Sequence, residues 1–142
     1  MNENYDNKKP IKIAHLINPF KCAEDNPSYL YYAQPITFKS MLNAQIEGSK
    51  TGLDIKLYAA NYPEDDDIIP EYFNKLPHLL KSTITEFPEI SGTRKLPIIQ
   101  EMFNSILEHS DADYIIFTNS DIGVQKNFYI KVTDYILSLI HI

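Results

Sequence analysis

The chain has 142 residues, 44% of them hydrophobic and 23% charged, which allows one globular domain with a sizeable core. Its net charge of -6 argues against a nucleic-acid-binding surface, because such surfaces carry a basic footprint. The single cysteine, Cys22, excludes an internal disulfide, and no apolar run approaches the roughly 18 residues that span a bilayer. We therefore expect a cytoplasmic protein, either free or peripheral to a membrane.

The N-terminus predicts a loose tail followed by a strand. Residues 1–10 are rich in Asn, Lys, Glu and Asp, and the domain is expected to occupy residues 11–142. Residues 11–17 (IKIAHLI) predict the first strand, which ends at the turn signal Asn18-Pro19. Within this strand, His15 is interpreted as a core histidine with a local hydrogen-bonding partner.

A helix and a second strand are expected next. Residues 20–33 predict an irregular loop whose three tyrosines either contact a substrate or cover the sheet edge. Gln34-Pro35 predicts the start of a helix with an apolar stripe from Ile36 to Ile46. Residues 53–60 alternate like a strand, so the order predicts parallel pairing through a right-handed crossover.

The second half continues the alternation. In chain order, we expect an acidic loop at 61–67, two short helical turns within 68–80, a short strand at 83–87, a loop at 88–93, a helix from 93 to 109, a buried strand at 114–117 and a last helix beginning after Gly123. Alternating strands and helices predict an α/β fold, with a mostly parallel, Rossmann-like sheet of about four strands and flanking helices.

The stretch from Asp113 to Gly123 (DYIIFTNSDIG) organises these expectations. An apolar strand leads directly into Asn119, Ser120 and Asp121. Ligands of open α/β sheets bind at the carboxyl ends of strands, and an Asp there can hold a hard metal ion together with substrate phosphates. The alternative is an ordinary Asx-type turn that caps a following helix.

Polar groups follow the other predicted strands as well. Asn18 follows the first strand, and Glu64 and Asp65 belong to the acidic run that follows the second. Such side chains can contact a base or ribose, although an acidic run is more often a solvated loop. The basic pair Arg94-Lys95 could steady phosphates, although such pairs usually lie on a solvated surface.

On residues 11–60 and 93–123, the sequence resembles the N-terminal half of a GT-A-type glycosyltransferase of the family 2-like kind. The Asn119-Ser120-Asp121 triplet stands where that family has an Asp-x-Asp motif. The resemblance implies that Asp121 binds Mn²⁺ or Mg²⁺ and that a nucleotide-diphosphate sugar is the donor. Asn119 replaces the first Asp of the motif, so its contact to ribose or metal is weakened or indirect.

The resemblance implies sugar transfer to an unknown acceptor, which could be a saccharide, a lipid or a protein. Only a short segment follows Asp121, so no catalytic residue is assigned and the chain is expected to be truncated. One alternative is an inactive remnant or interaction module that self-associates through an exposed sheet. Another is a different metal-dependent phosphoryl-processing protein that uses Asp111 and Asp113.

Overall fold

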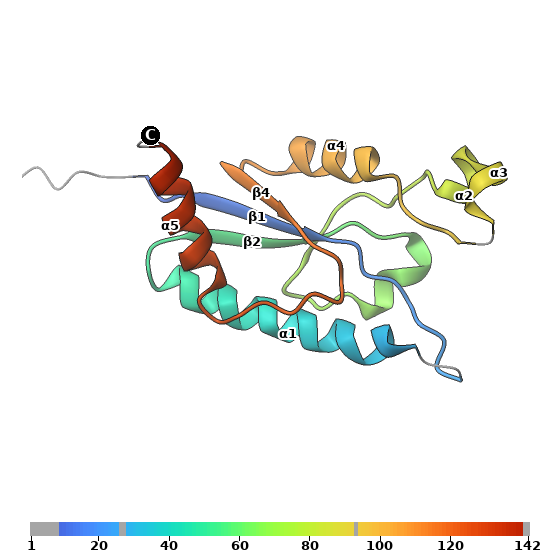
Figure 1. Ribbon diagram of the computed structural model, residues 1–142, viewed down its shortest axis with the longest axis horizontal. Coiled ribbons are helices and arrows are strands. Elements are labelled where there is room, and N and C mark those ends of the chain that lie inside the picture. Colours follow the sequence, from blue (N-terminus) through green and yellow to red (C-terminus); the bar gives the residue numbers. More distant parts are fainter. Residues whose placement is uncertain (1–8, 26–27, 93, 141–142) are drawn as a thin grey trace, which may run out of the picture.

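The computed structural model describes residues 9–25, 28–92 and 94–140; the expected tail at 1–10 therefore lies mostly outside the described residues. The described elements are β1 (Lys12–Ile17), α1 (Tyr29–Ser49), β2 (Asp54–Ala59), the 3-10 helix η1 (Pro63–Ile68), β3 (Asn74–Lys75), α2 (Thr83–Glu86), α3 (Pro88–Ser91), α4 (Ile99–His109), β4 (Tyr114–Phe117) and α5 (Phe128–Ile140). They form a four-stranded, all-parallel sheet in the order β3-β2-β1-β4. The α/β fold class expected from the sequence is confirmed (Figure 1).

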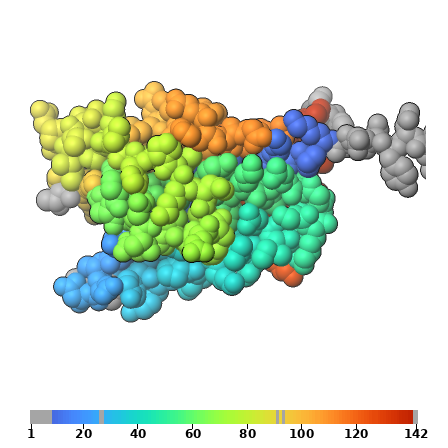
Figure 2. Space-filling model, turned by 180° about the vertical axis from the view of Figure 1, so that it is seen from behind, coloured from blue at the N-terminus to red at the C-terminus, as the bar shows by residue number. Residues whose placement is uncertain are grey.

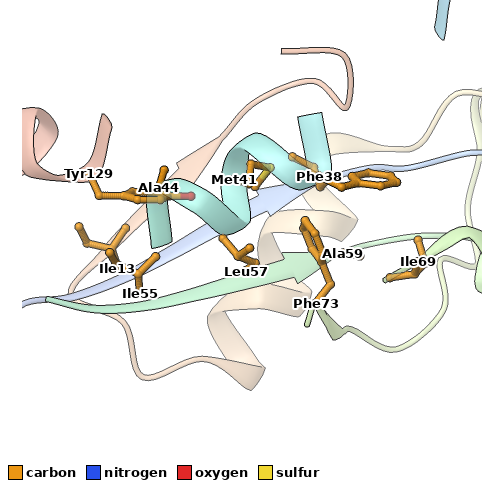
Figure 3. Packing of buried hydrophobic residues seen from close by; sticks show 11 residues of the cluster. Ile13, Phe38, Met41, Ala44, Ile55, Leu57, Ala59, Ile69, Phe73 and Tyr129 are labelled. Carbon is orange, nitrogen blue, oxygen red and sulfur yellow. The ribbon is translucent and has the colours of Figure 1, made fainter. Parts of the chain in front are cut away.

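Helices α1 and α5 cover one face of the sheet (Figure 1). Figure 3 shows strand residues such as Ile13 and Leu57 pointing toward Met41 and Ala44 of α1, with Tyr129 of α5 closing one end. These side chains are almost completely buried. Alternate residues of β1 and β2 supply this layer, because successive strand side chains point to opposite faces.

Helix α4 covers the opposite face. Its buried Met102 and Ile106 pack with Leu16 of β1 and Tyr58 of β2. Seen from behind, the segment after β2 fills the space between α1 and α4 (Figure 2). Since both faces of β1 are covered, its side chains from Ile13 to Ile17 are all buried.

Several predicted elements are confirmed. The strands expected at 11–17, 53–60 and 114–117 and the final helix all exist, with boundaries within a few residues. In the structure β4 lies at an edge of the sheet, and all its side chains are only partly buried. The expectation of a fully buried strand at 114–117 was therefore wrong, because this strand pairs on one side only within the described part of the chain.

The prediction of the first helix was wrong in its start and right only in part in its buried face, since Phe38 and Met41 of the predicted stripe are buried. The helix begins at Tyr29, and Pro35 lies inside it rather than in its first turn. Ile36 and Ile46 are exposed, while Thr37, Phe38, Met41, Ala44 and Gly48 face the sheet. Small residues form part of this face because the helix approaches the strands closely; a Cβ added to Gly48 would lie 2.4 Å from Ile55 Cδ1.

The region between β2 and α4 also differs from expectation. The acidic run forms η1, residues 74–75 form the short strand β3 in place of the two helical turns, and residues 83–86 and 88–91 are single helical turns in place of a strand and a loop. Helix α4 begins at Ile99, not near Arg94; Thr93 lies outside the described residues. Pro97 instead forms an isolated antiparallel bridge with Ser82, which keeps the preceding segment extended.

Within the described ranges, no helix is both long and apolar enough to cross a membrane.

Two residues of α1 distinguish the observed helix face from the one expected from the sequence. Met41 is fully buried, whereas Ile46 is 51% exposed. We expect Met41→Ala to lower the free energy of unfolding by about 2–5 kcal/mol, because it leaves a cavity in the core. Ile46→Ala should change it by less than about 0.5 kcal/mol. Urea denaturation measures both, and equal costs would contradict the observed packing.

Candidate functional site

Three strands present their carboxyl ends at one edge of the sheet. The parallel register pairs Ile17 with Ala59 and Leu16 with Phe117. The polar residues that follow β1, β2 and β4 therefore emerge close together, as in other open parallel sheets. The side-chain amide of Asn18 donates to the carbonyl of Ala60 at 2.7 Å and ties two of these ends to each other.

A pocket of about 390 Å³ opens between the ends of β1 and β4. We call it the strand-end pocket. Its polar wall brings Asn18 together with the consecutive residues Asn119, Ser120 and Asp121, which are about 100 positions away in the sequence. Its apolar lining comes from Phe20, Tyr29, Leu30, Leu96, Pro97, Ile99, Met102 and Phe117. A few convergent polar groups on an apolar wall are typical of small-molecule sites.

Asp121 lies in a turn at the rim of this pocket. The Ile122 N–H donates to the Asn119 carbonyl at 3.2 Å, which closes a backbone turn rather than the expected Asx-type turn. It caps no helix in the described chain, since α5 begins only at Phe128. The Tyr29 hydroxyl donates to Asp121 Oδ2 at 3.1 Å, and this bond raises the pKa of Tyr29.

The donor set around Asp121 bears on the predicted metal. Among the residues that the structure describes, no group of three or more His, Cys, Asp or Glu side chains could hold an ion. Asp121 is thus the one acidic side chain in the strand-end pocket lining. Mg²⁺ is often bound through one or two carboxylates plus substrate phosphates and water. The residues present therefore fit a divalent cation that arrives with a phosphate ligand.

The acidic run after β2 is engaged in internal contacts. Asp65 is 5% exposed and accepts the Lys21 backbone N–H at 2.8 Å, and burial raises its pKa. Asp66 accepts hydrogen bonds from Asn61 and pairs with His78 at 2.9 Å, and both contacts lower its pKa. The run therefore fastens η1 to the neighbouring loops, rather than forming a freely solvated loop.

The basic pair predicted to steady phosphates is split. Lys95 forms an ion pair with Glu64, and its Nζ lies 3.8 Å from the centroid of the Tyr62 ring. The ion pair lowers the pKa of Glu64. Arg94 is exposed, and its carbonyl accepts the Thr83 hydroxyl at 2.7 Å.

The predicted site residues thus fall into two groups. The strand-end pocket brings together Asn18, Asn119 and Asp121. The residues Glu64, Asp65, Arg94 and Lys95 do not line it, although Leu96 and Pro97, which directly follow the basic pair, do. Asp111 instead pairs with Lys12, at the amino end of the sheet and away from the pocket.

A group of hydrogen-bonded side chains, formed by His15, Tyr129 and Thr118, lies next to the site residues. His15 is fully buried in β1; its Nδ1 lies 2.7 Å from the Tyr129 hydroxyl and its Nε2 lies 2.8 Å from Thr118 Oγ1. Burial lowers the pKa of His15 to about 4, so the ring is neutral at neutral pH. The interpretation as a core histidine with a local partner is confirmed. The two hydrogen bonds also connect Tyr129 of α5, through His15, to Thr118, the residue that precedes Asn119.

Sequence reasoning left open whether the loop tyrosines contact a substrate, and it predicted neither the Tyr29 bond to Asp121 nor the Thr118 bond to His15. A signal for Tyr29 existed: Ser28 is a favourable residue type at a helix N-cap, and it does occupy that position in α1. A helix capped by Ser28 starts at Tyr29, about one and a half turns before the start predicted at Gln34-Pro35. No local signal marks Thr118, because its partner His15 is 103 positions away.

The buried histidine makes stability depend on pH. Between about pH 6.5 and 4, the unfolded chain binds a proton at His15 that the folded protein does not, so stability falls as pH falls. From about pH 7.5 to about pH 5, we expect this residue to account for a loss of about 2 kcal/mol. Urea denaturation at both pH values should show a smaller loss for His15→Gln than for the unmodified protein.

His109 supplies the matched control for this measurement. It is exposed on α4, and its ring bonds only the Ser105 carbonyl of the same helix. His109→Gln should leave the pH dependence unchanged. Equal changes in the two variants would refute the assignment to His15.

Comparison of the chain with models of known protein families, with curated protein sequences and with solved structures gave no match. The resemblance to GT-A glycosyltransferases therefore has no support beyond the sequence motifs that carry it.

Proposed function

We propose that the chain is a glycosyltransferase-like protein that binds a nucleotide-diphosphate sugar and a divalent cation at the strand-end pocket. The sugar would pass to a saccharide, lipid or protein acceptor. We propose that the protein acts in the cytoplasm and that the cation is Mn²⁺ or Mg²⁺.

The observation that carries the proposal is the convergence of Asn18, Asn119 and Asp121 on one pocket. They come from two strand ends separated by about 100 residues of sequence. A carboxylate, amides and apolar walls suit a ligand that has both a charged part and a flat, less polar part. A nucleoside diphosphate has both.

The cation supplies the positive charge that this acidic protein lacks. With its net charge of -6, the chain would repel a diphosphate unless a metal or a local basic group intervened. Asp121 would hold the metal against the phosphates, where a divalent ion can assist departure of the diphosphate as a Lewis acid. Of the basic pair predicted to steady phosphates, Arg94 has an exposed side chain, whereas Lys95 is paired with Glu64.

The single carboxylate predicts that cation and nucleotide bind together. We expect UDP or GDP to bind in the presence of Mn²⁺ and to bind at least about tenfold more weakly without it, because phosphate oxygens complete the metal's ligand shell. Asp121→Ala should abolish the difference that Mn²⁺ makes. Isothermal titration calorimetry measures these affinities.

Asp134→Ala is the matched control, since Asp134 is exposed on α5 and its loss changes the net charge equally. It should bind like the unmodified protein. If the folded protein binds neither nucleotide, or if the two variants lose binding equally, the donor-binding proposal is wrong.

The open edge of β4 favours a second candidate function, an interaction module without catalysis. Within the described chain β4 pairs only with β1, and its four apolar residues are partly exposed. An uncovered edge strand with apolar side chains is a template for pairing with another chain. A second copy could pair antiparallel along the same edge around a two-fold axis.

Charge on the edge would prevent such pairing. We expect the unmodified protein to sediment as a dimer and Tyr114→Lys as a monomer, because edge lysines block strand addition. Tyr114 belongs to neither buried cluster, so its replacement should spare the fold. Tyr135→Lys, on the exposed side of α5, should still form dimers. Monomeric unmodified protein would refute this candidate.

A further inference from the structure

A second, larger pocket lies on the other side of Phe20. It has a volume of about 970 Å³ and opens between the loop after β1, the first half of α1 and the end of η1. We call it the tyrosine pocket. Its lining residues are Phe20, Lys21, Cys22, Glu24, Tyr31, Tyr32, Gln34, Pro35, Ile36, Phe38, Asp67 and Ile68. Neither the sequence motifs nor the proposed donor site uses it.

The walls of the tyrosine pocket are fixed by specific bonds. Gln34, which is 4% exposed, holds both backbone groups of Phe20: its Oε1 accepts the N–H at 3.1 Å and its Nε2 donates to the carbonyl at 2.8 Å. The next residue, Lys21, donates its N–H to Asp65 and pairs through Nζ with Asp67 at 2.8 Å. The loop is therefore held to α1 on one side and to η1 on the other.

The tyrosine pocket is lined by exposed aromatic rings that belong to neither hydrophobic core cluster. Tyr31 is 41% and Tyr32 62% exposed, and the two rings meet edge to face at 5.2 Å. Ile36, one turn further along α1, is also exposed at the pocket. These side chains keep flat apolar surface next to solvent, where burial by a ligand would be favourable.

Charged groups at the same pocket select the kind of ligand. A wholly apolar ligand would remove water from Glu24 and from the exposed Lys21–Asp67 pair without replacing their hydrogen bonds, which is costly. A sugar ring has C–H groups that pack on an aromatic face and hydroxyl groups that bond carboxylates and ammonium groups. Hydrogen bonds to charged partners are the stronger ones.

We propose that the tyrosine pocket binds a saccharide. Tyr31 and Tyr32 form the stacking surface, and Lys21, Glu24 and Asp67 bond the hydroxyl groups. Because the pocket shares Phe20 with the strand-end pocket, a saccharide there is placed to act as acceptor, a role that rests on the proposed function. Saccharide binding itself requires neither nucleotide nor metal.

Saturation-transfer NMR on the full chain tests the proposal without Mn²⁺ or nucleotide. The probes are five disaccharides: maltose, cellobiose, lactose, chitobiose and mannobiose. We expect at least one of them to receive saturation from the protein. Tyr32→Ala should weaken its binding about two- to tenfold, because it removes one aromatic contact.

Tyr135→Ala is the matched control, because Tyr135 is 72% exposed on α5 and lies outside both pockets. It should leave disaccharide binding unchanged. Binding of none of the five probes, or equal weakening in both variants, would overturn the proposal. Calorimetry with UDP and Mn²⁺ tests the donor site in a separate experiment. If neither UDP nor Mn²⁺ binds, the acceptor role is wrong, but the proposed saccharide site is unaffected.

Discussion

The pairing of β1 with β2 on one side and β4 on the other constrains everything else in the molecule. Both faces of β1 are covered, so its five residues from Ile13 to Ile17 have no access to solvent. Chemistry is possible only where the strand ends. There the chain turns outward at Asn18, beside the ends of the two neighbouring strands. His15, the one ionisable side chain among these five residues, is kept neutral, and both its ring nitrogens form hydrogen bonds.

These two bonds give the core a role at the site. Thr118 follows β4 directly and accepts or donates at His15 Nε2, while Tyr129 of α5 occupies Nδ1. A neutral imidazole has one donor and one acceptor nitrogen, so the two hydroxyls must take complementary roles. The start of the turn that carries Asn119 and Asp121 is thus tied to a fully buried group. A turn anchored in this way can present its carboxylate with little loss of freedom on binding.

The parts of the fold that sequence could predict are those with strong local patterns. The strands at 11–17 and 114–117 are short, apolar and bounded by turn residues, and both were placed correctly. The start of α1 was misplaced because Pro35 is typical of a first helical turn, yet it lies seventh in this helix. The single turns α2 and α3 carry local signals that were not used, a capping box between Ser82 and Thr85 and Pro88 at the start of α3. For the site, strand-end position predicted the convergence of Asn18 and Asp121, whereas ion pairing diverted Lys95 toward Glu64.

Phe20 is the point at which the two pockets meet, and its position is set by backbone rather than by side-chain packing. Gln34 bonds both backbone groups of Phe20, so the backbone of this residue cannot shift without breaking two part-buried hydrogen bonds. Leaving a buried amide unpaired costs about 1–3 kcal/mol, more than a weak ligand contact returns. Phe20 therefore lies at the shared boundary of a pocket that carries a carboxylate for a cation and a pocket that carries exposed tyrosines. A fixed boundary lets two ligands lie side by side without either having to order the loop between them.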